Sequence, residues 1–149
     1  MQRENVIATA IVDAAYKIHK SLGPGLLESA YETVLIYELQ KRGLSVSSQV
    51  SIPIVYESIC LETGFRADLV VEELVIIELK SIEKIAPVHK KQLTTYLKLA
   101  DKRLGLLINF GEELIKNGIT RVVNGLSDEN LQTVFRAKAL SSQSKTNEI

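Results

Sequence analysis

The sequence predicts a domain of mixed α and β structure, of class α/β (α+β), with the element order ααβββαβ(β). Two observations predict it. Two helical patterns precede any strand pattern, and the later apolar runs are short, rich in Val and Ile, and interrupted by a third helical pattern. With 149 residues and 46% hydrophobic content, the chain is long enough for one core. We expect one domain over residues 1–135 and a polar tail without regular structure over 136–149.

The two N-terminal helices are predicted over residues 5–20 and 26–41. In the first, apolar residues recur every three to four positions, which is the period of an amphipathic helix. Gly23, Pro24 and Gly25 interrupt this pattern. Gly43 follows the second helix, where a left-handed cap is expected.

The remaining elements follow from β-branched residues and turn signals. Pro53 favours an edge strand or a bulge, and Glu72 with Glu73 separates two apolar runs that predict a β-hairpin. Pro87 predicts the start of a helix. The predicted strands cover 44–61, 65–71, 74–80, 104–110 and 119–123, and the predicted third helix covers 88–100.

Charge is balanced over the whole chain but not along it. Net charge is zero, which argues against a protein that wraps long nucleic acids through its overall field. Residues 55–79 contain six acidic side chains and one basic side chain, whereas residues 80–103 contain seven Lys or Arg and two acidic side chains. An acidic pocket beside a basic surface suits metal-dependent phosphate chemistry, although two solvated faces would give the same composition.

Other sequence features limit the setting in which the protein acts. No apolar run approaches the ~20 residues that a membrane span requires, and the N-terminal segment lacks the continuous apolar centre of a secretory signal. We therefore expect a cytoplasmic protein without membrane partners. The single cysteine, Cys60, is interpreted as a buried and inert thiol.

Three ionisable residues in the predicted hairpin are the strongest functional candidates. Glu78 and Lys80 are two positions apart on one strand, so they project from the same face. If a three-residue loop centred on Glu73 joins the strands, Asp68 lies opposite Glu78 with Cβ atoms about 5 Å apart. A two-residue loop would turn Asp68 to the other face. Otherwise, Asp68 ends a strand and the other two form a surface ion pair.

This spacing resembles the D-x(n)-E-x-K signature of the PD-(D/E)XK nuclease superfamily, with Asp68, Glu78, Leu79 and Lys80 at its positions. Two further motifs extend the resemblance. Gln92 and Tyr96 resemble a Q-x-x-x-Y element of an exonuclease-like branch. The run GPGLLESAY resembles the G-x-x-E-x-x-Y element that names the GxxExxY proteins, with Gly25, Glu28 and Tyr31 at its positions. The similarity extends over most of residues 7–125.

The resemblance implies a restriction-endonuclease-like core, with a mixed central sheet flanked by helices. It also implies hydrolysis of phosphodiester bonds in nucleic acid, with DNA favoured over RNA. Mg²⁺ or Mn²⁺ would be held by Asp68, Glu78, the carbonyl of Leu79 and Glu28, and Lys80 would assist the attacking water. Glu28 falls on the apolar stripe of its helix, which predicts that it faces the core; alternatively, it only occupies a favourable first turn.

The resemblance places Gln92, Tyr96 and Tyr31 among the substrate-binding residues. Lys and Arg side chains could steer a phosphate backbone collectively; they are Lys84, Lys90, Lys91, Lys98, Lys102 and Arg103. The main alternative is an inactive nuclease-derived binding or regulatory module, and a weaker one is an enzyme that hydrolyses smaller phosphoesters. A homodimer could supply missing substrate surface through strand 104–110 or the edge strand near Pro53.

Overall fold

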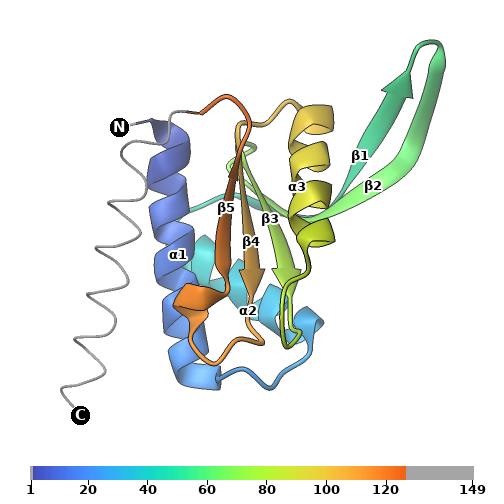
Figure 1. Ribbon diagram of the computed structural model, residues 1–149. Helices are drawn as coiled ribbons and strands as arrows, with labels where there is room; N and C mark the ends of the chain where they lie inside the picture. Colours follow the sequence, from blue (N-terminus) through green and yellow to red (C-terminus); the bar gives the residue numbers. More distant parts are fainter. Residues whose placement is uncertain (1, 127–149) are drawn as a thin grey trace.

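The computed structural model describes residues 2–126, so the predicted tail over 136–149 and the end of the predicted domain lie outside the described residues. The described elements follow the predicted order (Figure 1). They are α1 (Arg3–Leu22), α2 (Glu28–Lys41), β1 (Val46–Tyr56), β2 (Ile59–Val71), β3 (Val75–Lys80), α3 (Pro87–Ala100), β4 (Leu104–Asn109), the 3-10 helix η1 (Ile115–Asn117) and β5 (Ile119–Val123).

The five strands form one mixed sheet in the order β1-β2-β3-β4-β5. Neighbouring strands are antiparallel except β3 and β4, which are parallel and joined through α3. A helical crossover is the usual connection between parallel neighbours. This sheet, with helices on both faces, is the PD-(D/E)XK arrangement that the resemblance implied.

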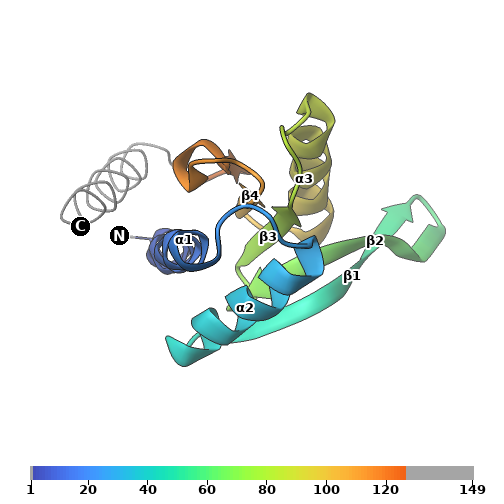
Figure 2. The same cartoon turned by 90° about the horizontal axis from the view of Figure 1, so that it is seen from below.

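Each face of the sheet has its own apolar cluster. Helices α1 and α2 cover one face, and α3 covers the other (Figures 1 and 2). Strand β3 supplies both clusters because its side chains alternate: Ile77 and Leu79 pack under α1 and α2, whereas Ile76 packs under α3. The all-apolar appearance of this strand in the sequence therefore reflects burial on two sides.

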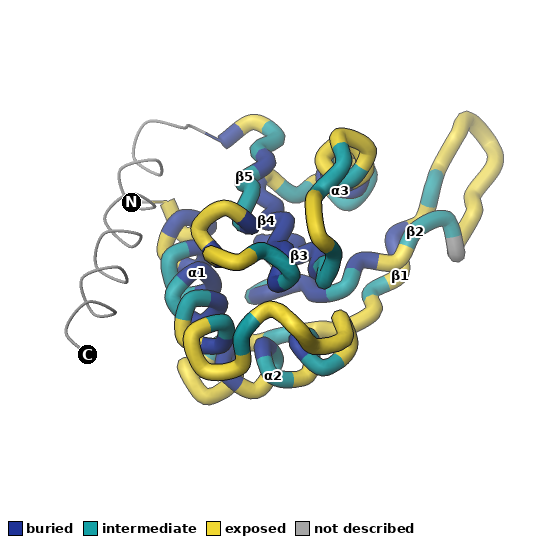
Figure 3. The backbone as a smooth tube through the Cα atoms, turned by 60° about the horizontal axis from the view of Figure 1, so that its bottom comes forward, coloured by how far each residue is buried: buried dark blue, intermediate teal, exposed yellow. Residues whose placement is uncertain are grey.

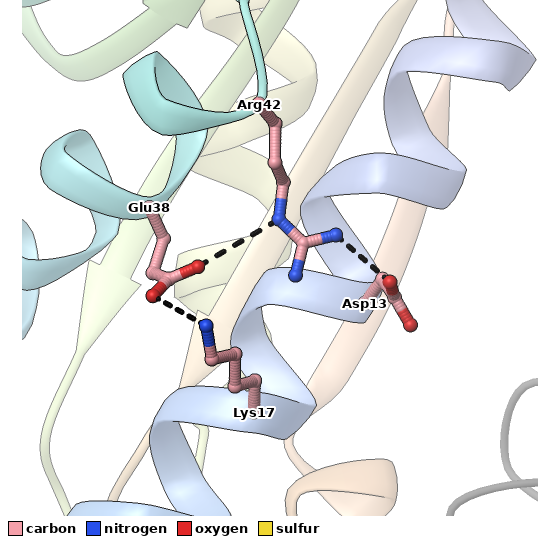
Figure 4. Close-up of polar contacts among 4 residues, drawn as sticks. All are labelled: Asp13, Lys17, Glu38 and Arg42. Carbon is pink, nitrogen blue, oxygen red and sulfur yellow. Dashed lines mark hydrogen bonds and ion pairs between the residues drawn. The ribbon is translucent and has the colours of Figure 1, made fainter.

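A buried carboxylate joins the two N-terminal helices. Glu38 of α2 accepts an ion pair from Lys17 of α1, with Nζ 3.0 Å from Oε1 (Figure 4). Arg42 lies between Glu38 and Asp13, with its Nη1 2.8 Å from Asp13 Oδ2. The hydrogen bond from Lys17 is the main cause that lowers the pKa of Glu38. These ion pairs hold the C-terminal part of α2 against α1.

The strand predicted over 44–61 is wrong in its extent. The structure ends β1 at Tyr56 and begins β2 at Ile59, so residues 57–58 form a tight hairpin turn. Glu57 adopts a φ of 51°, which the sequence does not signal because the turn contains no Gly or Asn. The predictions for Pro53 are confirmed: β1 is an edge strand, and its register shifts between Ile52 and Ile54.

Two further expectations change. Cys60 is exposed rather than buried, because it lies on the long β1-β2 hairpin that extends beyond α3 (Figure 1). Strand β4, predicted as one of two dimer surfaces, is buried throughout and lies between β3 and β5 in the sheet. Among residues 2–126, no helix is long and apolar enough to cross a membrane.

Candidate metal centre

The register between β2 and β3 decides whether the predicted carboxylates meet. Val71 pairs with Val75, and Leu69 pairs with Ile77. The connection is therefore the three-residue loop 72–74 centred on Glu73. The same register places Asp68 opposite Glu78, as the three-residue alternative predicts.

At Asp68 and Glu78, side chains replace the regular strand pairing. The backbone N–H of Asp68 donates to Glu78 Oε1 at 3.2 Å, and the backbone N–H of Leu79 donates to Asp68 Oδ2 at 2.8 Å. The paired register between the strands ends at Leu69 and Ile77, just before this point. The two carboxyl groups therefore lie where β2 separates from β3, each fixed by the other strand's backbone.

Glu78 is buried, and its environment disfavours the charged form. Burial first, and then the nearby Asp68 carboxylate, raise the pKa of Glu78 to about 8. Lys80 and the hydrogen bond from the Asp68 backbone act in the opposite direction but are weaker. Two close carboxyl groups are held together either by a shared proton or by a cation.

Lys80 lies on the same side of the sheet as Glu78. Both alternate along β3 with Leu79, whose side chain belongs to the cluster under α1 and α2. Lys80 is partly buried at the carboxyl end of β3. An ammonium at this position can approach a group bound at the two carboxylates.

Glu28 is the first residue of α2, and it lies at the rim of the site rather than in the core. The prediction that it faces the core is corrected: the residue is exposed, because the helix begins only at this position. Partial burial and the Asp68 carboxylate nevertheless raise the pKa of Glu28, and Lys80 lowers it. Glu28 thus shares an electrostatic environment with Asp68 and Lys80.

Helix α3, which covers the other face of the sheet from α2, brings Tyr96 near Asp68 and Glu78. Tyr96 is buried against Phe65, with ring centroids 4.5 Å apart. Its pKa is raised by burial and by the charges of Glu78 and Asp68. Gln92 stands one turn earlier on α3 and is exposed. The carboxylates therefore interact with the buried Tyr96, and Gln92 faces solvent one helical turn away from it.

Tyr31, predicted to bind substrate, has a different place. Its ring is fully buried and stacks on Phe110, with centroids 4.4 Å apart. Its hydroxyl donates to the carbonyl of Gly23 and accepts from the N–H of Leu26 at 3.1 Å. Tyr31 has no surface left for a substrate, so we assign it to holding the α1-α2 loop that precedes Glu28.

Two residues missed in the sequence support the site. Ser81 Oγ donates to the carbonyl of Leu26 at 2.5 Å, which joins the residue after Lys80 to the loop before α2. Asn109 is fully buried at the end of β4 and pairs with Lys80. Its side chain bonds both backbone groups of Ile82, at 3.1 and 2.9 Å. The polar end of the apolar run LGLLIN was the one available signal for Asn109.

The donor set fits a hard divalent cation. Within residues 2–126, no three His, Cys, Asp or Glu side chains converge as a ready-made metal cluster. Mg²⁺, however, is commonly held by one or two carboxylates, with waters and substrate oxygens in the other positions. Asp68 and Glu78 supply four carboxyl oxygens, and one oxygen of each accepts a backbone N–H that fixes the group in position.

The sequence matches the profile of a family described as the PD-(D/E)XK nuclease superfamily over residues 5–122. No curated protein sequence matches the chain. Among solved structures, SSO0001 is similar with a TM-score of 0.49 and 18% identity, over 95% of this chain and 75% of that chain. An alkaline exonuclease, LHK-Exo from Laribacter hongkongensis, is similar with a TM-score of 0.39 and 14% identity, over 99% of this chain and 95% of that chain. The complex of LHK-Exo with dAMP gives a TM-score of 0.39 and 15% identity.

Proposed function

We propose, since this chain belongs to the PD-(D/E)XK nuclease superfamily, that it hydrolyses phosphodiester bonds in nucleic acid with the help of Mg²⁺ or Mn²⁺. The observation that carries the proposal is the juxtaposition of Asp68 and Glu78 where two strands separate, with Lys80 on the same face. We also assign the chain to the GxxExxY branch, on the residues Gly25, Glu28 and Tyr31.

Asp68 and Glu78 bind the cation in this proposal, because both are fixed by backbone donors before any ligand arrives. Preformed carboxylates lose little conformational freedom on binding. The carbonyl of Leu79 is a third oxygen on the same strand. Glu28 binds the cation directly or through a water, since its charge interacts with that of Asp68.

The bound cation would polarise a phosphoryl oxygen and lower the pKa of a coordinated water. Lys80 would orient that water or balance the negative charge that develops on the phosphate. Gln92, which is exposed, would contact the phosphate. The buried Tyr96 would pack beside the carboxyl groups of Asp68 and Glu78 and hold them in place.

We propose DNA as the substrate, bound along the lysines of α3. Lys90, Lys91 and Lys98 are exposed on α3, the helix that carries Gln92 and Tyr96. Contacts between lysines and phosphates release counterions, so the affinity for nucleic acid should fall steeply as salt concentration rises.

An assay of the purified protein against labelled single- and double-stranded DNA and RNA, with Mg²⁺, Mn²⁺ or EDTA, tests the proposal. We expect cleavage with metal only. Asp68→Ala and Lys80→Ala should abolish it while leaving the circular dichroism spectrum unchanged. The exposed Lys20→Ala, in the last turn of α1, is the control and should cleave normally.

Cleavage by the Asp68 and Lys80 variants at the rate of the parent would remove both residues from catalysis. A parent that binds nucleic acid but never cleaves it would instead identify the chain as an inactive binding module.

A further inference from the structure

The chain that leaves β3 after Lys80 is held in place although residues 81–86 belong to no helix or strand. It changes from buried within β3 to half-buried over residues 80–82 and to exposed at Glu83 (Figure 3). The pairing of β3 with β4 ends at Lys80, whose carbonyl accepts from the N–H of Phe110 at 2.9 Å. Beyond this point, the backbone is held by a side chain rather than by a strand.

The amide of Asn109 is the hydrogen-bonding partner of Ile82. The N–H of Ile82 donates to Oδ1 at 3.1 Å, and Nδ2 donates to the carbonyl of Ile82 at 2.9 Å. Oδ1 also accepts from the N–H of Gly111 at 3.0 Å. Asn109 is fully buried, and a buried amide is costly unless it is hydrogen-bonded. Its three hydrogen bonds therefore stabilise one arrangement of Ile82 and Gly111.

Gly111 leaves the space that the backbone of Ile82 occupies. A Cβ added at Gly111 would lie 2.7 Å from the nitrogen of Ile82 and would also meet its carbonyl group. Gly111 does not adopt a left-handed φ, so other residues could take its conformation, and close packing is what requires glycine. Asn109 and Gly111 together form a clamp that holds Ile82 by hydrogen bonds and by backbone packing.

A shift of Ile82 would reach two residues of the proposed site. Lys80 lies two residues before it. Ser81, between the two, donates to the carbonyl of Leu26, in the loop that precedes Glu28. The clamp therefore restrains both the backbone that carries the Lys80 side chain and the loop from which α2 begins.

The two carboxylates are fixed independently of the clamp. The backbone N–H of Asp68 donates to Glu78, and the backbone N–H of Leu79 donates to Asp68. Both hydrogen bonds join β2 to β3, and neither involves the chain after β3. Loss of the clamp should therefore displace Lys80 while cation binding is retained.

We propose that Asn109 and Gly111 are positioning residues, which hold the chain after β3 so that Lys80 and Glu28 stay beside the two carboxylates. The inference rests on the proposed nuclease function for the roles of Lys80 and Glu28, whereas the restraint on Ile82 is independent of it. An amide is required at position 109 because it both donates and accepts, whereas an ionised Asp only accepts and Leu does neither.

Asn109→Leu tests the proposal because it removes both hydrogen bonds to Ile82 with little change in volume. We expect the amides of Ile82 and Gly111 to exchange with deuterium about tenfold faster or more, as measured by NMR, since each loses its acceptor. The value of kcat on labelled DNA should fall by a similar factor. The affinity for Mn²⁺, measured by calorimetry, should stay that of the parent.

Asn124→Leu is the matched control. Asn124 Nδ2 donates to the carbonyl of Lys102 at 3.0 Å, near the other end of β4, so this variant loses a similar hydrogen bond away from the site. It should change neither the exchange of Ile82 nor kcat.

Gly111→Ala tests the clamp from the other side and replaces Asn109→Leu if that variant does not fold. Its methyl group fits only if the backbones of residues 82 and 111 separate, and it leaves the amide of Asn109 unchanged. It should also speed the exchange of Ile82 and lower kcat without weaker Mn²⁺ binding.

Three results would overturn the proposal: unchanged exchange of Ile82, faster exchange with the kcat of the parent, or a parallel loss of kcat and Mn²⁺ affinity. The last would show that the clamp supports the carboxylates or the whole fold. A parent that binds Mn²⁺ but cleaves no nucleic acid would instead overturn the proposed function. The exchange of Ile82 would then still decide whether Asn109 and Gly111 hold this segment.

Discussion

At the scale of single residues, the carboxyl group of Glu78 is the most perturbed in the site. Its pKa rises from the ordinary 4.5 to about 8, chiefly by burial and then by the Asp68 carboxylate. The folded protein therefore retains a proton that the unfolded chain releases at lower pH. The protonation of Glu78 therefore makes both the stability of the fold and the binding of a cation depend on pH.

The first prediction concerns that linkage. Without metal, Glu78 contributes stability that is fully present below pH 4.5 and is lost progressively as pH rises to about 8. Urea unfolding of the metal-free protein should show this loss, and Glu78→Gln should remove most of it. Addition of Mn²⁺ should release protons below pH 8 and stabilise the parent most at alkaline pH. If the free energies of unfolding of parent and variant differ by the same amount at every pH from 4.5 to about 8, Glu78 is not the group that causes the loss.

A second residue-scale prediction concerns Ser81, a positioning residue for Glu28. Ser81 Oγ holds the carbonyl of Leu26, two residues before Glu28, and Tyr31 holds the N–H of the same residue. Loss of one such hydrogen bond costs about 0.5–1.5 kcal/mol, so Ser81→Ala should lower kcat roughly two- to tenfold. Ser81→Thr, which keeps the hydroxyl, should restore most of it.

The matched control combines Ser81→Ala with Glu28→Gln. If Ser81 acts by placing Glu28, its substitution should have little further effect on kcat or Mn²⁺ affinity once Glu28 is replaced. Additive effects in the double variant would mean that Ser81 acts on the fold alone.

At the scale of elements, the turn between β2 and β3 determines the site. Glu72 and Glu73 both adopt left-handed φ angles, of 52° and 58°, and the loop length sets which residue faces Glu78. Turn length was left open by the sequence because both a two-residue and a three-residue loop were compatible with the apolar runs. The three-residue form is the one that places Asp68 and Glu78 opposite each other.

This dependence gives a third prediction. Insertion of one Ala between Leu69 and Val70, with the Val71–Val75 pair kept, moves Asp68 one position along β2 and turns its side chain to the face opposite to that of Glu78. We expect this variant to lose Mn²⁺ binding, as measured by calorimetry. Replacement of Glu73 by Gly keeps the loop length and suits the positive φ, so it should bind metal normally and be more stable by up to about 1 kcal/mol. Metal binding by the insertion variant would show that the register does not matter.

At the scale of the whole molecule, local patterns predicted the elements better than the contacts between them. Helix periodicity and the β-branched runs gave the element order, and Asp68, Glu78, Lys80 and Tyr96 share the predicted neighbourhood. The β1-β2 hairpin was missed because its turn, residues 57–58, contains no Gly or Asn. The resemblance predicts a substrate role for Tyr31, but its burial is not predictable from the motif, because its stacking partner, Phe110, is distant in the chain.

The central claim is that Asp68 and Glu78, opposed by the three-residue turn, bind one divalent cation. Calorimetric titration of the metal-free protein with Mn²⁺ at pH 8.5, above the raised pKa of Glu78, tests it most directly. We expect saturable binding by the parent and none by Asp68→Asn, with binding retained by the Lys20→Ala control. Equal binding by the parent and Asp68→Asn, or no binding by the parent with or without DNA, would contradict it.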